Sequence, residues 1–156
     1  MLKYLLLSFA ILLNGCAGGV IASGTAASSI IYDERSVEVM LEDTNIEHLA
    51  AKAISKDPML KNTHISTSSL NHKVLVYGEV TTATQRALAY RLVSNIPKVG
   101  HVYNQIKITP SLSIADTSND SWITSKVRLA LFNAKKLHSA QVKVITENKI
   151  VYLMGI

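Results

Sequence analysis

The stretch DSWITSKVRLALF, Asp120 to Phe132, has a counterpart earlier in the chain, DTNIEHLAAKAIS, Asp43 to Ser55. Laying Asp120 on Asp43 gives an offset of 120 − 43 = 77 residues, and the alignment continues without a gap to Gly78 and Gly155. The identical pairs are Asp43/Asp120, Ile46/Ile123, Ala53/Ala130, Leu60/Leu137, Asn71/Asn148, Val74/Val151 and Gly78/Gly155. Such agreement at apolar positions indicates an internal duplication, and two copies predict two tandem small domains.

Each copy carries the signals of a helix followed by a β-hairpin. The dipeptides Asp43-Thr44 and Asp120-Ser121 supply oxygens that can cap a helix just before periodic apolar positions. Apolar and polar residues then alternate on both sides of a turn, which is Asn71-His72 in the first copy and Asn148-Lys149 in the second.

The first copy continues with a second helix and a third strand. Apolar spacing around Leu88 and Leu92 predicts a helix that ends at Pro97, and alternation from Val102 to Ile108 predicts a strand. We therefore expect an α+β fold of two αββαβ domains, each a three-stranded sheet packed by two helices. By the repeat offset the second copy extends to 109 + 77 = 186, so we expect it to lack its last helix and strand, as a fragment or as a truncated natural copy.

The N-terminus has the layout of a signal peptide. In MLKYLLLSFAILLNGC, one early lysine precedes an apolar run that is too short to span a bilayer permanently. LNGC, Leu13 to Cys16, resembles the lipobox of bacterial lipoproteins, which implies lipidation of Cys16; the alternative is an ordinary secretory signal that ends in cysteine. By the same resemblance to bacterial lipoproteins, Ala17 after this cysteine implies sorting to the outer membrane. The expected divisions are a signal peptide, a lipidated tether, a first domain, a linker and a second domain, at 1–15, 16–42, 43–109, 110–119 and 120–156.

Charge and motifs narrow the function classes. The formal charge of +5 and the pI near 9.4 favour an anionic partner. The five histidines lack metal-ligand spacing, and there is no catalytic triad pattern or glycine-rich phosphate loop. We expect a protein that is not an enzyme and holds no cofactor or metal. The export signal argues against nucleic acid as a partner.

The repeated pattern resembles a known family. It runs Asp43-Thr44, Ala53-Ile54, Asp57, Leu60, Ile65, then Val74-x-Val76-x-Gly78-x-Val80, Val99 and Val102-x-Asn104. This pattern is similar to the BON domain, and a lipobox followed by two such domains resembles the dual-BON outer-membrane lipoproteins. The resemblance implies αββαβ units, binding of anionic phospholipid by the first helix of the second domain, and support of outer-membrane integrity.

The helix from Asp120 to Phe132 has more apolar bulk than one buried face can use. At 100° per residue, Ile123, Val127, Ala130 and Leu131 define the face expected to meet the sheet, which leaves Trp122, Leu129 and Phe132 outside it. The first copy has Asn45, Lys52 and Ser55 at those three positions. Basic side chains surround the extra apolar ones, so we expect a membrane-binding set that comprises Trp122, Lys126, Arg128, Leu129, Phe132, Lys135 and Lys136.

The sequence leaves other readings of this helix open. The extra apolar residues could pack on the first domain or within their own, with outward strand residues such as Leu75, Tyr77, Tyr152 and Met154 as partners, and the lysines could be a solvated face. The preferred hypothesis is a lipid-anchored protein on the periplasmic side of the outer membrane that binds anionic phospholipid. The alternative is a scaffold whose patch or open strand edge binds an envelope protein.

Overall fold

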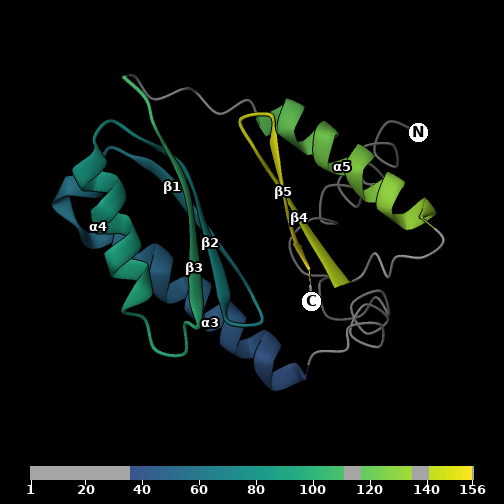
Figure 1. The fold of residues 1–156 in the computed structure, drawn as a ribbon, viewed down its shortest axis with the longest axis horizontal. Coiled ribbons are helices and arrows are strands. Elements are labelled where there is room, and N and C mark those ends of the chain that lie inside the picture. The colour runs from purple at the N-terminus through teal and green to yellow at the C-terminus, as the bar shows by residue number, and fades with distance from the viewer. Residues whose placement is uncertain (1–35, 111–116, 135–140, 156) are drawn as a thin grey trace, which may run out of the picture. The chain divides into compact units, whose positions relative to one another are not determined.

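The structure is a computed structural model and describes residues 36–110, 117–134 and 141–155. The elements in chain order (Figure 1) are α3 (Val37–Lys56), the 3-10 helix η1 (Pro58–Leu60), β1 (His64–Leu70), β2 (Lys73–Val80), α4 (Ala83–Ser94), β3 (His101–Ile108), α5 (Thr117–Asn133), β4 (Val142–Glu147) and β5 (Ile150–Gly155). The predicted α+β class is therefore confirmed.

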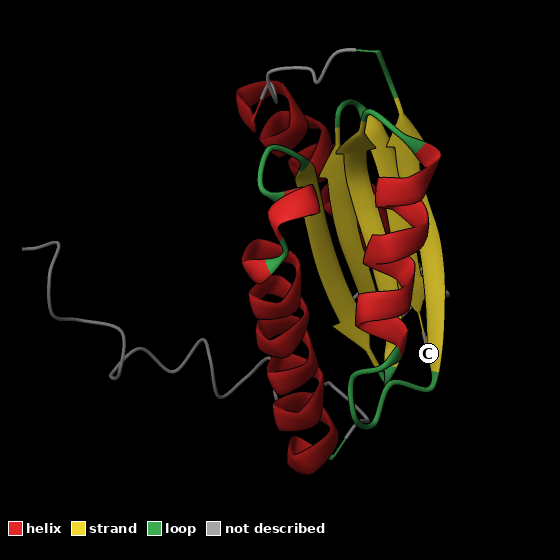
Figure 2. Cartoon of the chain, turned by 90° about the vertical axis from the view of Figure 1, so that its left-hand side faces the viewer, coloured by secondary structure: helices red, strands yellow, loops and turns green. Residues whose placement is uncertain are grey.

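The first copy is built on a three-stranded sheet in the order β1-β2-β3. Strands β1 and β2 are antiparallel, and β3 lies parallel to β2. Helix α3 packs against β1 and α4 packs against β2 and β3, so the strands form a layer with helices beside it (Figure 2). Side chains along β2 point alternately to the two faces of the sheet. Val74, Val76 and Val80 face the helices, and all three are fully buried in the core.

In the described residues the second copy has one helix and a hairpin. Strands β4 and β5 pair as an antiparallel hairpin, and α5 packs against β4. Among the described residues of this copy, Val144 is the one hydrophobic residue that is buried as deeply as the core of the first. The described part of the second copy therefore contributes fewer deeply buried apolar residues than the first copy.

The aspartates predicted to cap helices do not cap them. Helix α3 begins at Val37, inside the segment assigned to the tether, and Ser36 caps it by accepting from the backbone N of Val39. Helix α5 begins at Thr117, inside the segment assigned to the linker. Asp43 and Asp120 therefore lie within their helices, and both side chains are buried.

Each of these aspartates binds the tip of the hairpin that follows. The Asp43 carboxylate accepts from the backbone N of Asn71 at 2.7 Å and of His72 at 2.9 Å. The Asp120 carboxylate accepts in the same way from Asn148 and Lys149, at 2.7 and 2.8 Å. All four turn residues have φ between 49° and 64°, a left-handed conformation that directs two consecutive N–H groups toward the carboxylate.

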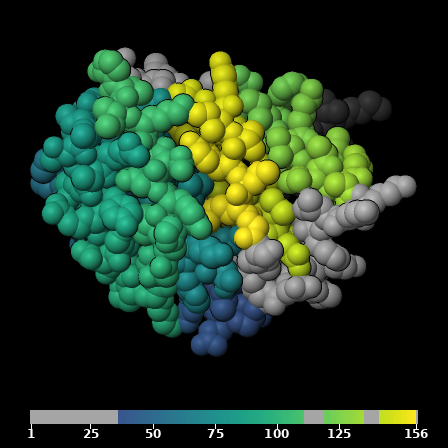
Figure 3. All heavy atoms as spheres, in the orientation of Figure 1, coloured from purple at the N-terminus to yellow at the C-terminus, as the bar shows by residue number. Residues whose placement is uncertain are grey.

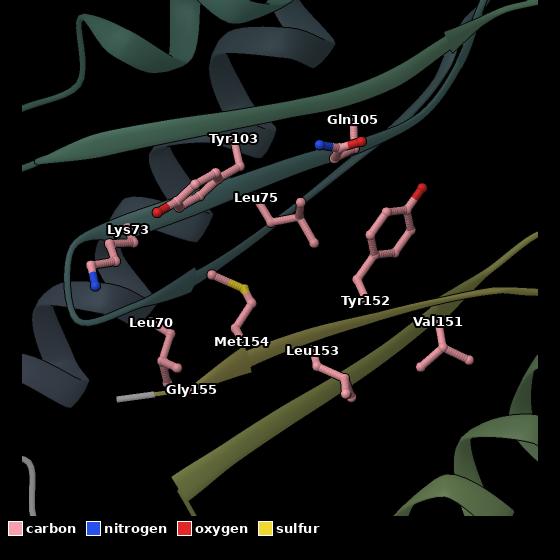
Figure 4. A pocket seen from close by; sticks show the side chains of 10 residues that line it. All are labelled: Leu70, Lys73, Leu75, Tyr103, Gln105, Val151, Tyr152, Leu153, Met154 and Gly155. Atoms are coloured by element: carbon pink, nitrogen blue, oxygen red, sulfur yellow. The ribbon is translucent and has the colours of Figure 1, made fainter.

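The hairpin of the second copy lies against the outer face of the first sheet. The rings of Tyr77 and Tyr152 have centroids 6.0 Å apart, and Leu75 and Met154 point into the same seam (Figure 4). Leu75 is buried although it points away from the helices of its own copy. The outward strand residues therefore pack on one another, and do not serve as partners for Trp122.

Polar contacts cross the same seam. Lys143 Nζ lies 2.6 Å from Glu47, His64 Nε2 lies 2.9 Å from Glu147, and the Asn148 side chain donates to buried Glu79 at 2.7 Å. These contacts join the hairpin of the second copy to the first copy.

Candidate membrane-binding helix

Three large apolar side chains of α5 are exposed to solvent. The exposed fractions are 58% for Trp122, 61% for Leu129 and 74% for Phe132. Relative to Trp122, Leu129 is rotated by about 20° and Phe132 by about 80° around the helix axis, so the three share one side. We call this set, Trp122, Leu129 and Phe132, the apolar stripe.

The opposite side of α5 faces the second hairpin. Ile123, Val127 and Leu131 are half-buried, and Thr124 Oγ1 donates to Thr146 Oγ1 at 2.7 Å. Ala130 was expected on this buried face but is exposed. Two strands cover a narrower arc of the helix than a full sheet would, and Ala130 lies at the edge of that arc.

Cations lie beside the apolar stripe. Lys126 Nζ is 3.9 Å from the centroid of the Trp122 ring, which is a cation–π contact. Arg128 is exposed and lines a polar hollow of about 460 Å³ together with Ser125, Thr146 and His64. Lys135, Lys136 and the predicted lipidation site Cys16 lie outside the described residues.

The first copy shows that the fold does not require this stripe. Asn45, Lys52 and Ser55 occupy the equivalent positions on α3, and all three are exposed. The same site on the same fold therefore tolerates polar side chains. The fold of the first copy therefore gives no structural reason for large apolar side chains at these positions of α5.

Most acidic side chains of the described residues are engaged in contacts with other groups of the chain. Glu42 bonds to Lys98 and His72, and these contacts hold the pKa of its carboxyl below the ordinary value. Glu47 and Glu147 form the seam contacts already described, and Asp57 caps η1 through the backbone N of Met59. Neither Lys126 nor Arg128 pairs with an acid of the described chain.

Sequence reasoning did not find the polar hollow under α5. Its wall includes His64 and Glu147, whose side chains are in contact at 2.9 Å and belong to strands of different copies. No local pattern in the sequence links these two residues. Over the described ranges, no cluster of His, Cys, Asp and Glu is placed to hold a metal ion, and no helix is both long and apolar enough to cross a membrane.

Comparison with known families gives a match to both copies. The BON domain matches residues 42–110 and 119–156. The chain belongs to the BON-domain family. It is 32% identical over 152 residues to the outer membrane lipoprotein DolP of Haemophilus influenzae, which covers 97% of this chain and 79% of that protein.

Two other proteins also match this chain, each over a smaller share of its own length. The chain is 33% identical over 124 residues to a 21 kDa hemolysin of Actinobacillus pleuropneumoniae, which covers 79% of this chain and 64% of the hemolysin. Among solved structures, CdsD, a structural protein of the type III secretion system of Chlamydia trachomatis, aligns with a TM-score of 0.32 and 12% identity over 70% of this chain and 45% of that one. That likeness is too low to carry an argument.

Proposed function

We propose that this BON-domain protein is a lipoprotein of the outer membrane, anchored through Cys16 on the periplasmic side, whose helix α5 binds anionic phospholipid and supports envelope integrity. The observation that carries the proposal is the exposed apolar stripe beside Lys126 and Arg128. The similarity to an outer membrane lipoprotein over nearly the whole chain supports the location.

The apolar stripe provides the hydrophobic part of membrane binding. Full burial of a side chain such as Trp, Leu or Phe contributes about 1.5 to 3 kcal/mol, and partial burial at the headgroup level contributes less. Trp122 suits this level because an indole has a large apolar body and one polar N–H. Insertion requires no unfolding, since all three side chains are already exposed.

The cations provide selectivity for anionic lipid. Each Lys or Arg close to an anionic bilayer contributes about 1 kcal/mol, and the contribution falls with salt. Lys126 and Arg128 lie on the same helix as the stripe, so lipid phosphates can contact them while the apolar side chains enter the boundary.

Neither contribution alone would hold a soluble protein firmly on a membrane. Lipidation of Cys16 would keep α5 close to the bilayer, and the high local concentration would make a weak contact effective. In this arrangement the acyl chains attach the protein, and α5 selects the lipid composition.

Vesicle co-sedimentation tests the proposal. The chain without residues 1–16 should sediment with vesicles that contain phosphatidylglycerol and remain in solution with vesicles of phosphatidylcholine alone. Trp122→Ala should weaken binding several-fold, because it removes the largest side chain of the stripe. Tyr90→Ala is the matched control, since Tyr90 is an exposed aromatic residue on α4 in the first copy.

Two results would count against the proposal. Equal binding to both kinds of vesicle would remove the role of anionic lipid. A thermal unfolding midpoint that falls sharply in Trp122→Ala would show that the indole is part of the packed interior.

A further inference from the structure

The polar hollow under α5, of about 460 Å³, lies where the two copies meet. On the face drawn in Figure 3, atoms of the β4–β5 hairpin lie between the first copy and α5. The hollow is at the end of this junction near the second hairpin turn, since Thr146 and Glu147 are the last two residues of β4. All nine described residues that line it have polar side chains, and five of these carry hydroxyls. Small-molecule sites commonly lie between domains, and a polar lining favours a polar ligand.

The other elements of an αββαβ unit do not cover this flank of the first helix. Three positions of α5 at the hollow have exposed counterparts on α3 at the 77-residue offset, namely Thr44, His48 and Ala51. These stay exposed in the first copy, which has a second helix and a third strand. A second copy with the same elements would therefore leave the hollow open.

One charged donor at the hollow is available for a ligand. The Asp120 carboxylate accepts from two backbone N–H groups of the hairpin turn, at 2.7 and 2.8 Å. Glu147 is in contact with His64 Nε2 at 2.9 Å. Arg128 is exposed and pairs with no acid of the described chain. Because a guanidinium binds phosphate oxygens through two parallel N–H groups, Arg128 favours an oxyanion.

The inner wall offers partners for hydroxyl groups. Thr146 Oγ1 accepts from Thr124 Oγ1 at 2.7 Å, which leaves the hydrogen of the Thr146 hydroxyl for another acceptor. Glu147 contacts His64 through one carboxylate oxygen, which leaves the second oxygen to accept. The Glu147 side chain is 15% exposed, whereas Arg128 is exposed. A ligand would therefore direct its hydroxyl groups inward and its anionic group toward the opening.

We propose that the hollow binds a hydroxylated phosphate, the phosphate ester of a sugar or polyol, with its phosphate on Arg128 and its hydroxyl groups toward Thr146 and Glu147. Two sources carry this chemistry: a free sugar phosphate and the glycerophosphate headgroup of a lipid. None of the three side chains of the apolar stripe lines the hollow, so the site does not rest on the lipid contact of that stripe.

The probes are glucose 6-phosphate, glucose and inorganic phosphate, titrated into the isotope-labelled chain without residues 1–16 and followed by NMR chemical shifts of backbone amides. We expect saturable shifts at Ser66 and Thr146 with glucose 6-phosphate. Its dissociation constant should be at least about tenfold lower than those of glucose and phosphate, because it alone makes both kinds of contact. Equal affinity for glucose 6-phosphate and inorganic phosphate would overturn the proposal, and so would shifts confined to residues outside the hollow.

Variants locate the phosphate. Arg128→Gln should weaken binding of glucose 6-phosphate about tenfold and leave binding of glucose unchanged. Arg91→Gln changes an exposed arginine of α4 outside the hollow, so it is the matched control and should change neither. Trp122→Ala should also leave glucose 6-phosphate binding unchanged, although it weakens vesicle binding. An equal effect of the two arginine variants would overturn the proposal.

A further variant locates the hydroxyl groups. Thr146→Val should weaken binding of glucose 6-phosphate and of glucose several-fold and leave binding of phosphate unchanged. Because Thr146 also accepts from Thr124, the thermal unfolding midpoint of the variant is measured beside wild type. An unchanged affinity for glucose 6-phosphate in folded Thr146→Val would contradict the inward direction of the hydroxyl groups.

Glycerol 3-phosphate distinguishes the two sources. If a lipid headgroup is the ligand, glycerol 3-phosphate should bind as tightly as glucose 6-phosphate and should displace the chain from phosphatidylglycerol vesicles. If a free sugar phosphate is the ligand, glucose 6-phosphate should bind more tightly and vesicle binding should not change in its presence. Both results support the proposed chemistry. Failure of both compounds to bind would overturn it whether or not the chain binds vesicles, which separates this test from that of the apolar stripe.

Discussion

At the scale of single residues, the buried aspartates connect each helix to its hairpin. The Asp43 carboxylate accepts from two turn N–H groups and from Ser69 Oγ at 2.6 Å. An asparagine side chain at this position offers only one acceptor oxygen. Its NH2 group would face an N–H donor of the turn and could not accept from it. Asp43→Asn should therefore lower the free energy of unfolding by about 2 to 3 kcal/mol, measured by urea denaturation.

Asn45→Ala is the control for that measurement, because Asn45 is exposed on the same helix. It should change the free energy of unfolding by less than about 0.5 kcal/mol. If Asp43→Asn were as mild as Asn45→Ala, the aspartate would not hold the turn.

Two glycines that are equivalent in the sequence repeat differ in the structure. Gly78 has φ of +114°, and a Cβ there would lie 2.0 Å from the backbone O of His64. A Cβ at Gly155 would meet nothing within 4 Å. Gly78→Ala should destabilise the protein by about 3 kcal/mol, while Gly155→Ala should change stability by less than about 1 kcal/mol, both measured by urea denaturation. Similar losses in both variants would mean that the environments of the two glycines are alike.

At the scale of elements, the sequence predicted the order of helices and strands in the first copy because apolar periodicity and turn residues are local signals. It misplaced the starts of α3 and α5, since Asp43-Thr44 and Asp120-Ser121 look like caps until the distant turn that the aspartate binds is known. It also could not predict which outward strand residues meet across the seam. That pairing depends on tertiary packing of segments from different copies.

The seam between the copies should weaken in alkaline solution. Burial, and next the negative charge of Glu147, raises the pKa of Tyr77 above its ordinary value, and burial raises the pKa of Tyr152. A folded pKa above the unfolded value gives a contribution to stability that is present below about pH 10 and lost as pH rises through the folded pKa.

Tyr77→Phe isolates this contribution. The stability of the wild-type chain should fall more steeply than that of Tyr77→Phe as the pH is raised above about 10, measured by urea denaturation at a series of pH values. Parallel curves would show that the Tyr77 hydroxyl ionises as freely in the folded chain as in the unfolded chain.

At the scale of the whole molecule, the exposure of the apolar stripe was predicted better than the packing of the two copies. Helical geometry and the polar residues of the first copy were enough to predict that Trp122, Leu129 and Phe132 lie off the buried face, and the three are exposed. The hollow that contains His64 and Glu147 could not be predicted, because it depends on the packing of one copy on the other. Composition gave the sign of the net charge, but the position of Arg128 beside this hollow depends on the fold.

The proposed lipid binding depends most on the entry of Trp122 into an anionic bilayer, and Trp122 is the single tryptophan of the chain. Tryptophan emission of the chain without residues 1–16 should therefore report on α5 directly. In buffer a soluble quencher should reach the indole. Phosphatidylglycerol vesicles should shift the emission to shorter wavelength and protect it from the quencher, while phosphatidylcholine vesicles leave both unchanged. Protein that binds the anionic vesicles with unshifted and still quenchable emission would contradict the account.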